Sequence, residues 1–479
     1  MRRPAIRSPA NKTGVISRGA VLITVLVALW TAARAEDDIA DKTPRRPSIM
    51  FNRWQEDWSV LADPRVPREP FDSLKYIPLS PDDPKTYLSF GAGLRERFEA
   101  NDAPGFGTGH NRNNDYLISR METHADLRIA SQIQVFVQLQ SDFAPGKTTI
   151  TPVDQNRLDL EQAFIAVTEP VADGTLKLRF GRQQFAFDLQ RFVAVRDGPN
   201  VRQSYDAAWV DYEHGPWRLI SFYSQPVQNK DQRAFDDYSS GALTFSGVRL
   251  ERSLSASSGI ALYYARFNQD NARFIAASGN ERRDIVDFRY FGSAAGFDWD
   301  LEAMNQTGRI GGKNIEAWAF GTLSGYTFDD VAMTPRIGLQ FDGASGNHNG
   351  QEFGTFNPLF PNGYYLTLAG YTGYVNFIHL KPSITIHPTN TLRVMFAAAA
   401  QWRETTADAV YTQPAVPVAG TAGRPGRYTG TYFQIRADYA ITTYSSAALE
   451  LVHFAIGDTL RRAGGHDSDY MGLELKWGW

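Results

Sequence analysis

The amino-acid sequence predicts an all-β fold, a closed antiparallel up-and-down β-barrel of the outer-membrane, transmembrane type. Apolar and polar residues alternate between residues 87 and 479 in stretches of about ten, the length of a tilted membrane strand. No apolar run of about 20 residues follows residue 35, which excludes membrane-spanning helices. The final stretch alternates up to Trp479, and a last strand that ends on an aromatic residue resembles the assembly signal of outer-membrane barrels.

Residues 1–35 are expected to be a secretory signal that is cleaved near Ala35. Basic residues precede an apolar run at 20–30, and the small-x-small sequence at 33–35 is followed by Glu36. The apolar run is too short to span a bilayer, and no stop-transfer segment follows it, which disfavours the alternative of an uncleaved anchor.

Removal of this signal takes away six basic and no acidic residues, so the formal charge falls from −3 to about −9. A mildly acidic chain has no general attraction for nucleic acid. The sequence contains no cysteine, which excludes disulfides and thiolate metal sites. We therefore expect the fold to depend on backbone ladders and packing.

Residues 36–86 are acidic and rich in proline, and they contain Trp54 and Trp58. We expect them to precede the barrel as a periplasmic extension or as a plug, and the sequence leaves both possibilities open. Residues 87–479 then form the barrel itself. At about 20–24 residues per strand and turn, this length gives roughly 16–19 strands.

The alternation assigns a face to each side chain, as the first stretch shows. One face carries Leu88, Phe90, Ala92 and Leu94, and the other carries Arg95, Arg97 and Glu99. The same alternation occurs at 117–129, 132–142, 336–342 and 433–439. In a soluble β-sandwich the charged face would contact solvent, whereas in a barrel it lines a wet interior. We prefer the barrel because it leaves no strand edge unpaired in lipid.

Long and short connections are distributed unevenly. The long loops are expected at 103–114, 148–157, 343–362 and 405–426, where Gly, Pro, Asn or Thr is frequent, and 169–175 is expected to be a short periplasmic turn. The residues at 111–115 could bind Ca²⁺, but we interpret them as a solvated turn.

Ordered blocks of the sequence resemble the alginate export family of outer-membrane barrels. These blocks are 52–58, 74–79, 87–99, 178–183, 202–207, 302–308, and 343–346 followed by 356–361. Asn347 stands where the family usually has Asp, which puts a ligand role of that loop in doubt, and Tyr205 stands where it often has Phe. The resemblance implies an 18-stranded monomeric barrel whose narrow pore passes an anionic polysaccharide through a constriction of arginines.

Arginine suits this task because its guanidinium is permanently charged and binds a carboxylate with two parallel hydrogen bonds. Most candidates lie opposite an apolar row, whereas Arg182, Arg191 and Arg202 come from the family blocks. The candidate pore-lining residues are Arg95, Arg97, Arg120, Arg128, Arg179, Arg182, Arg191, Arg202, Arg289, Arg336 and Arg436, with Glu99, Glu122, Asp206, Glu302 and Asp342 as partners. The alternative is that these arginines pair with carboxylates across strands and only stiffen the wall.

No catalytic residue, cofactor or metal site is expected. The eight histidines are scattered, and none has a zinc-like spacing or lies beside a glycine-framed serine. We predict passive passage of an anionic polysaccharide or oligosaccharide. The alternatives are a general or small-anion porin and, less favoured, a barrel enzyme such as a lipase or protease. Expected partners are the solute, outer-membrane lipid and the barrel assembly machinery, which would bind the strand ending at Trp479.

Overall fold

A computed structural model describes residues 45–108, 114–348 and 350–479. Residues 46–479 form one compact unit. The predicted signal at 1–35 and most of the possible turn at 111–115 lie outside the described residues. No helix among the described residues is both long and apolar enough to cross a bilayer.

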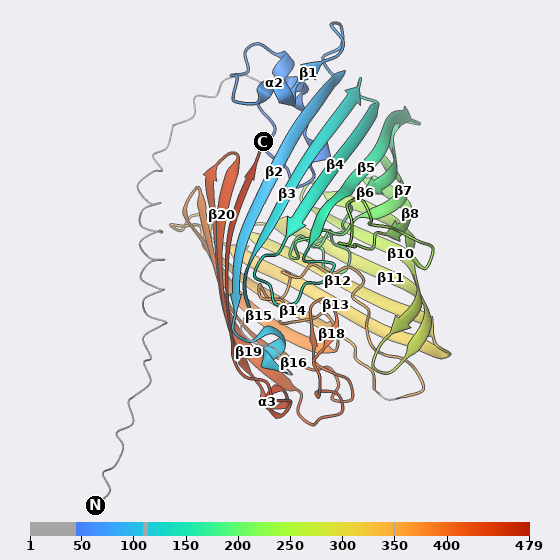
Figure 1. Ribbon diagram of the computed structural model, residues 1–479, viewed down its shortest axis with the longest axis vertical. Coiled ribbons are helices and arrows are strands. Elements are labelled where there is room, and N and C mark those ends of the chain that lie inside the picture. Colours follow the sequence, from blue (N-terminus) through green and yellow to red (C-terminus); the bar gives the residue numbers. More distant parts are fainter. Residues whose placement is uncertain (1–44, 109–113, 349) are drawn as a thin grey trace, which may run out of the picture. The chain divides into compact units, whose positions relative to one another are not determined.

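Eighteen antiparallel strands form a closed sheet, because the last strand pairs with the first (Figure 1). These strands are β2 (Tyr87–Asn101), β3 (Asn114–Ile129), β4 (Ile133–Phe143), β5 (Asn156–Val171), β6 (Gly174–Gln183), β7 (Tyr205–His214), β8 (Trp217–Pro226), β9 (Leu243–Ser255), β10 (Ser258–Arg273), β11 (Ser278–Ala294), β12 (Phe297–Ile310), β13 (Lys313–Thr327), β14 (Arg336–Ala344), β15 (Phe377–Thr389), β16 (Leu392–Trp402), β19 (Tyr428–Thr442), β20 (Ser445–Ile456) and β21 (Ser468–Gly478). The predicted 18-stranded up-and-down barrel is confirmed.

The remaining elements are short. They are the 3-10 helices η1 (Arg53–Gln55), η2 (Trp58–Ala62) and η3 (Pro104–Gly107), the α-helices α2 (Asp72–Lys75) and α3 (Asp458–Arg462), and the strands β1 (Ile77–Pro78), β17 (Tyr411–Thr412) and β18 (Val416–Pro417). β1 extends the main sheet by pairing with β2, and β17 pairs with β18 inside a loop.

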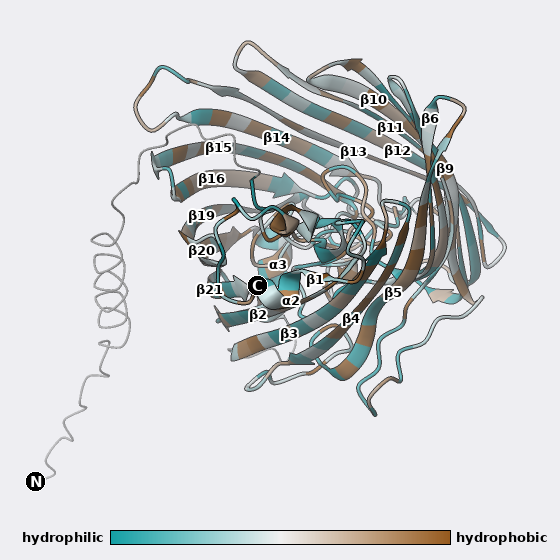
Figure 2. Cartoon of the chain, turned by 90° about the horizontal axis from the view of Figure 1, so that it is seen from above, coloured by the Kyte–Doolittle hydropathy of each residue, from teal (hydrophilic) through white to brown (hydrophobic). Residues whose placement is uncertain are grey.

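The two faces of each strand differ as the alternation predicts. On β2, Leu94 and Phe98 are each 37% exposed, whereas Arg95 and Arg97 are 4% and 1% exposed. Figure 2 shows the resulting alternation of hydrophobic and hydrophilic bands along the strands. Because successive side chains of a strand point to opposite faces, the apolar row contacts lipid and the charged row turns inward.

The connections differ between the two ends of the barrel. At one end, which we call the short-turn end, every connection has eight residues or fewer. An example is the two-residue turn of Ala172 and Asp173, both with positive φ, as hairpin turns of this type require. The other end, the long-loop end, carries the loops 184–204, 345–376 and 403–427. The loop at 345–376 extends well beyond its predicted limit, and the loop at 184–204 was not predicted.

Figure 2 shows loops inside the barrel from above, and the apolar packing identifies 184–204 and 345–376 as two long loops that turn inward. The largest apolar cluster packs loop residues such as Phe187 and Phe360 against inward side chains such as Trp209 on β7 and Tyr263 on β10. The rings of Phe187 and Tyr263 are 5.6 Å apart. An apolar core therefore lies in the interior beside β7–β13, interrupted by buried charges on β9–β12, and a second group of inward charges lies beside β2, β3, β20 and β21.

Residues 46–86 pack at the short-turn end, where β2 meets β21. The Arg53 guanidinium donates to the backbone oxygens of Ala92, at 3.1 Å, and of Trp479, at 2.6 Å. Trp58 and Leu61 of this segment form a small buried cluster with Tyr87 at the start of β2. The segment is thus fixed to both strands at the closure of the barrel.

Candidate functional site: two cavities separated by two loops

A cavity of about 320 Å³, the basic cavity, lies toward the short-turn end. Its described lining residues include five cationic side chains but a single carboxylate, that of Glu122. The cations are Arg53 from the N-terminal segment, Arg95 on β2, Arg120 on β3, Arg202 on the loop 184–204 and Lys476 on β21. The lining residues alone therefore carry more positive than negative charges, and carboxylates outside the lining, such as Glu56 at Arg53 and Glu474 at Arg95, pair with these cations at 2.6 Å.

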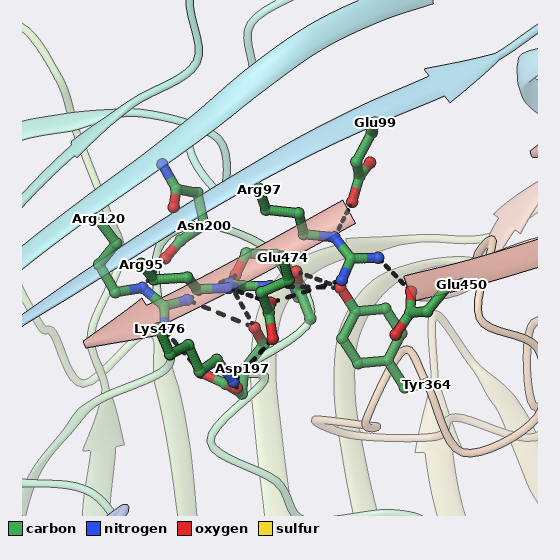
Figure 3. Close-up of polar contacts among 12 residues, drawn as sticks. Arg95, Arg97, Glu99, Arg120, Asp197, Asn200, Tyr364, Glu450, Glu474 and Lys476 are labelled. Atoms are coloured by element: carbon green, nitrogen blue, oxygen red, sulfur yellow. Dashed lines mark hydrogen bonds and ion pairs between the residues drawn. The ribbon is translucent and has the colours of Figure 1, made fainter. Parts of the chain in front are cut away.

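The loop residue Asp197 lies among these cations (Figure 3). Its carboxylate is 2.6 Å from Arg120, 2.9 Å from Arg202 and 3.4 Å from Lys476. Burial alone would raise the pKa of the Asp197 carboxyl, but the guanidiniums of Arg202 and Arg120 lower this pKa well below its usual range. Asp197 therefore stays charged and holds the loop against the cationic wall.

Arg95 connects the cavity wall to both inward loops. Its Nε donates to Glu474 on β21 at 2.6 Å, and one Nη donates to the backbone oxygen of Asp197 at 3.0 Å. The other Nη lies 3.4 Å from the hydroxyl oxygen of Tyr364, on the loop 345–376. Because a guanidinium carries donors in a fixed planar fork, Arg95 sets the relative position of these groups.

Arg97 lies next along β2, among acceptors from three strands. It forms ion pairs with Glu99, at 2.7 Å, and with Glu450 on β20, and it donates to the Tyr470 hydroxyl at 2.5 Å. Its guanidinium also lies 5.1 Å from the centre of the Tyr364 ring (Figure 3). Arg97 is thus held in place by ion pairs and by a cation–π contact.

A second cavity of about 260 Å³, the upper cavity, is lined by Gly198, Pro199 and Tyr364, together with Glu99 and Tyr116. The Tyr364 hydroxyl donates to the Gly198 backbone oxygen at 3.2 Å. The two inward loops therefore meet between the basic cavity and the upper cavity. We call this meeting point the loop contact.

Three further predicted residues form a separate cluster beside β9–β12. Arg191 pairs with Asp300 at 2.7 Å and with Glu302 at 2.6 Å, and Arg289 pairs with Asp188 at 2.7 Å. This cluster anchors the first residues of the loop 184–204 to the wall.

The remaining predicted arginines are held by other partners. Arg128 pairs with Asp126 at 3.0 Å, and Arg336 and Arg436 pair with Asp298 and Asp438 at 2.8 Å. Arg179 has no carboxylate within ion-pair distance among the described residues, and the Trp54 ring covers its guanidinium at 4.5 Å. Asp342 accepts from Tyr365 at 2.9 Å, away from the basic cavity.

Arg182 and Asp206 are not brought together with the other candidates. They face each other across β6 and β7 and form an ion pair at 2.9 Å. An odd spacing along a strand places two side chains on opposite faces of the sheet. Arg182 is three residues from the inward Arg179, and Asp206 is three residues from the inward Trp209, so Arg182 and Asp206 lie on the outer face. The family blocks suggested Arg182, and the alternation separates it from the inward row.

Several residues of the site were not among the predicted candidates, and four of them are Lys476, Asp197, Arg53 and Tyr364. Lys476 was visible in the polar row of the final stretch, and Asp197 begins an Asp-Gly-Pro-Asn sequence typical of a turn. Arg53 lies in the family block 52–58, but nothing there indicated its contacts, and Tyr364 carried no signal. The roles of both residues arise from the packing of segments distant in sequence.

The comparisons with known proteins agree with this fold. A family model described as alginate export matches residues 86–474. No curated protein sequence matches the chain significantly.

Solved outer-membrane Occ barrels have the same fold. Acinetobacter baumannii OccAB3 aligns with a TM-score of 0.57 at 10% identity, over 82% of this chain and 99% of that one. OccAB1 of the same organism aligns at 0.56 and 10% identity, over 85% and 99%. Pseudomonas aeruginosa OccK2 (OpdF), solved in complex with glucuronate, aligns at 0.52 and 9% identity, over 82% and 96%. Because the family model matches most of the chain, this 18-stranded outer-membrane barrel belongs to the alginate export family.

Proposed function

We propose that the protein is a passive, selective outer-membrane pore for an anionic polysaccharide or oligosaccharide. The observation that carries this proposal is the basic cavity, whose lining has five cationic side chains and one carboxylate. A uronate polymer presents one carboxylate per sugar, and guanidiniums bind carboxylates with charge-assisted hydrogen bonds. Glucuronate, the ligand named for OccK2, is a single sugar that carries the same carboxylate as each unit of such a polymer.

The carboxylates beside these cations also fit transport. Arg95 and Arg202 are already paired with Glu474 and Glu122, each at 2.6 Å. A passing carboxylate must compete with these partners, which weakens its binding at each position. Weak binding at several successive positions allows a charged solute both to enter and to leave a pore.

The loop contact is the proposed gate. Arg95 reaches it from the basic cavity, whereas Gly198, Pro199 and Tyr364 line the upper cavity. A polymer that passes from one cavity to the other would have to separate Tyr364 from Gly198. The gate would therefore open when the two inward loops move apart.

Residues 46–86 are proposed to plug the short-turn end, which faces the periplasm in barrels of this type. The guanidinium of Arg202 lies 4.3 Å from the Phe51 ring, and that of Arg179 lies 4.5 Å from the Trp54 ring. These rings cover one cation of the loop 184–204 and one cation of the wall, so an anionic polymer that binds these guanidiniums must displace them. This supports the plug over the simple extension.

The further expectations complete the proposal. The signal would be removed near Ala35 during export in a Gram-negative cell, the barrel would act as a monomer, and the assembly machinery would bind β21.

The test is reconstitution of the refolded chain in planar bilayers. We expect a small, anion-selective conductance that uronate oligomers block at lower concentrations than neutral oligosaccharides of the same length. A large conductance without this discrimination would instead indicate a general porin. Cation selectivity would contradict the proposed function, and hydrolysis of added lipid or peptide would indicate an enzyme.

A further inference from the structure

Asp287 on β11 is a buried acid without a partner. Its residue is 0% exposed, and neither carboxylate oxygen forms a hydrogen bond or ion pair among the residues that the structure describes. Other buried acids nearby are paired, such as Asp300 with Arg191 at 2.7 Å. A buried, unpaired charge is costly, so Asp287 requires either a proton or a cation that the protein atoms do not supply.

Two further carboxylates face Asp287. The potential ligand oxygens of Asp188, Asp287 and Glu302 all lie within 4.8 Å of one another. Asp188 comes from the loop 184–204, whereas Asp287 and Glu302 come from the neighbouring strands β11 and β12. We propose that these three residues bind a divalent cation, with Ca²⁺ as the chemically preferred ion.

The local charge balance supports a bound cation. The guanidiniums that face the three carboxylates are those of Arg191, Arg249 and Arg289. The same guanidiniums also pair with Asp300 and Glu251. Glu251 is shared with a fourth guanidinium, that of Arg218 at 3.5 Å. Three guanidiniums thus face the four carboxylates of Asp188, Asp287, Asp300 and Glu302, and this excess of negative charge favours a bound cation.

The ligand atoms suit a hard cation. All three candidate ligands are carboxylates, and Ca²⁺ takes six to eight oxygen ligands in flexible geometry, including water. Asp188 accepts from Arg249 at 2.6 and 2.8 Å, and Glu302 accepts from Arg191 at 2.6 Å. These oxygens keep further lone pairs, and both oxygens of Asp287 are free to coordinate.

The ion would have a structural consequence that does not depend on what the pore transports. It would link the loop 184–204 to β11 and β12 through Asp188. The same loop carries Asp197 and Arg202 at the basic cavity. Removal of the ion is therefore expected to loosen this loop while the strands stay paired.

Terbium luminescence tests the site directly, because Tb³⁺ replaces Ca²⁺ in oxygen sites and is excited by nearby tyrosines. Tyr263 on β10 is paired with Asp287 across the ladder. In the refolded full chain we expect tyrosine-sensitised Tb³⁺ emission that Ca²⁺ competes away. Asp287→Asn should abolish the emission, and Tyr263→Phe should reduce it while Ca²⁺ still raises the melting temperature.

Asp142→Asn is the matched control, since Asp142 is also fully buried and has two oxygens without hydrogen bonds, but it lies outside this cluster. It should leave the emission unchanged. Should Asp287→Asn fail to fold, the wild-type melting temperature in EDTA and in Ca²⁺ decides. Equal values would show that Asp287 holds only a proton and would overturn the proposal, as would full emission from Asp287→Asn.

Discussion

The Tyr364 hydroxyl donates to the Gly198 backbone oxygen at 3.2 Å, so two loops that enter the barrel from the same end meet beside Arg95. The hydroxyl both donates to one loop and lies within reach of the wall arginine. If this contact is the gate, as proposed above, its strength would set the ratio of open to closed channels.

Tyr364→Phe removes the hydroxyl and keeps the ring. A single neutral hydrogen bond contributes about 1 kcal/mol, so we expect the ratio of open to closed channels to rise about fivefold. Single-channel recording measures this ratio. Tyr223→Phe is the control, because Tyr223 is 51% exposed on the outer face. An unchanged ratio for Tyr364→Phe would exclude the loop contact as the gate.

Lys476→Gln tests the charge of the basic cavity. Its side chain is 41% exposed, so the lost charge should weaken block by uronate oligomers by only about 0.5–1 kcal/mol, or twofold to fivefold. The effect should shrink as salt is raised.

Lys177→Gln is the matched control for this charge. Lys177 is 43% exposed and pairs with Glu213 at 2.9 Å, but it does not line the cavity. Equal loss of block in both variants would show that only net charge matters.

Trp54→Ala tests the plug. It removes the ring over Arg179, a cation–π contact of about 0.5–2 kcal/mol, while the hydrogen bond from Arg128 to the Trp54 backbone oxygen remains possible. We expect a larger conductance with stronger anion preference. Trp217→Ala removes a similar ring, 4.9 Å from Arg252 and 41% exposed, and should change neither quantity. Identical behaviour of the two variants would argue against a plug.

The docking of residues 46–86 is expected to depend on pH through Lys75. Burial, helped by the nearby charge of Arg53, lowers the pKa of Lys75 from 10.5 to about 7. Between about pH 7 and pH 10.5, Lys75 is protonated in the undocked segment and neutral in the docked segment. Docking therefore strengthens as pH rises above about 7, and it does not depend on Lys75 below that pH.

Chymotryptic cleavage within residues 46–86 measures this docking. Lys75→Met removes the titration, and comparison of the two chains at each pH cancels the pH dependence of the protease. The wild-type chain should become relatively more resistant by up to tenfold per pH unit. A constant ratio of the two cleavage rates would refute the proposed titration.

The strands were predictable because alternation is a local property. Leu94 and Arg95 are neighbours in sequence, and their 37% and 4% exposures follow from the strand geometry alone. The charged row on β2 could therefore be assigned to the inner face without knowledge of its partners. The family blocks supplied the number of strands, which residue counting left between 16 and 19.

The partners of that row were not predictable, because they depend on closure and on loops. Arg95 and Glu474 are separated by 379 residues and meet only because β2 pairs with β21. Asp197 reaches Arg120 because the apolar residues of its loop pack inside the barrel. No periodicity marks a loop that folds inward, so the loop contact and the Asp287 cluster required the structure.

Arg53 donates to Ala92 on one side of the β2–β21 pairing and to Trp479 on the other. Because Trp479 directly follows β21, Arg53 gains its second acceptor only when β21 has paired with β2. Docking of residues 46–86 is therefore complete only after the barrel has closed. A barrel in which β21 has not paired with β2 offers Arg53 only the Ala92 acceptor.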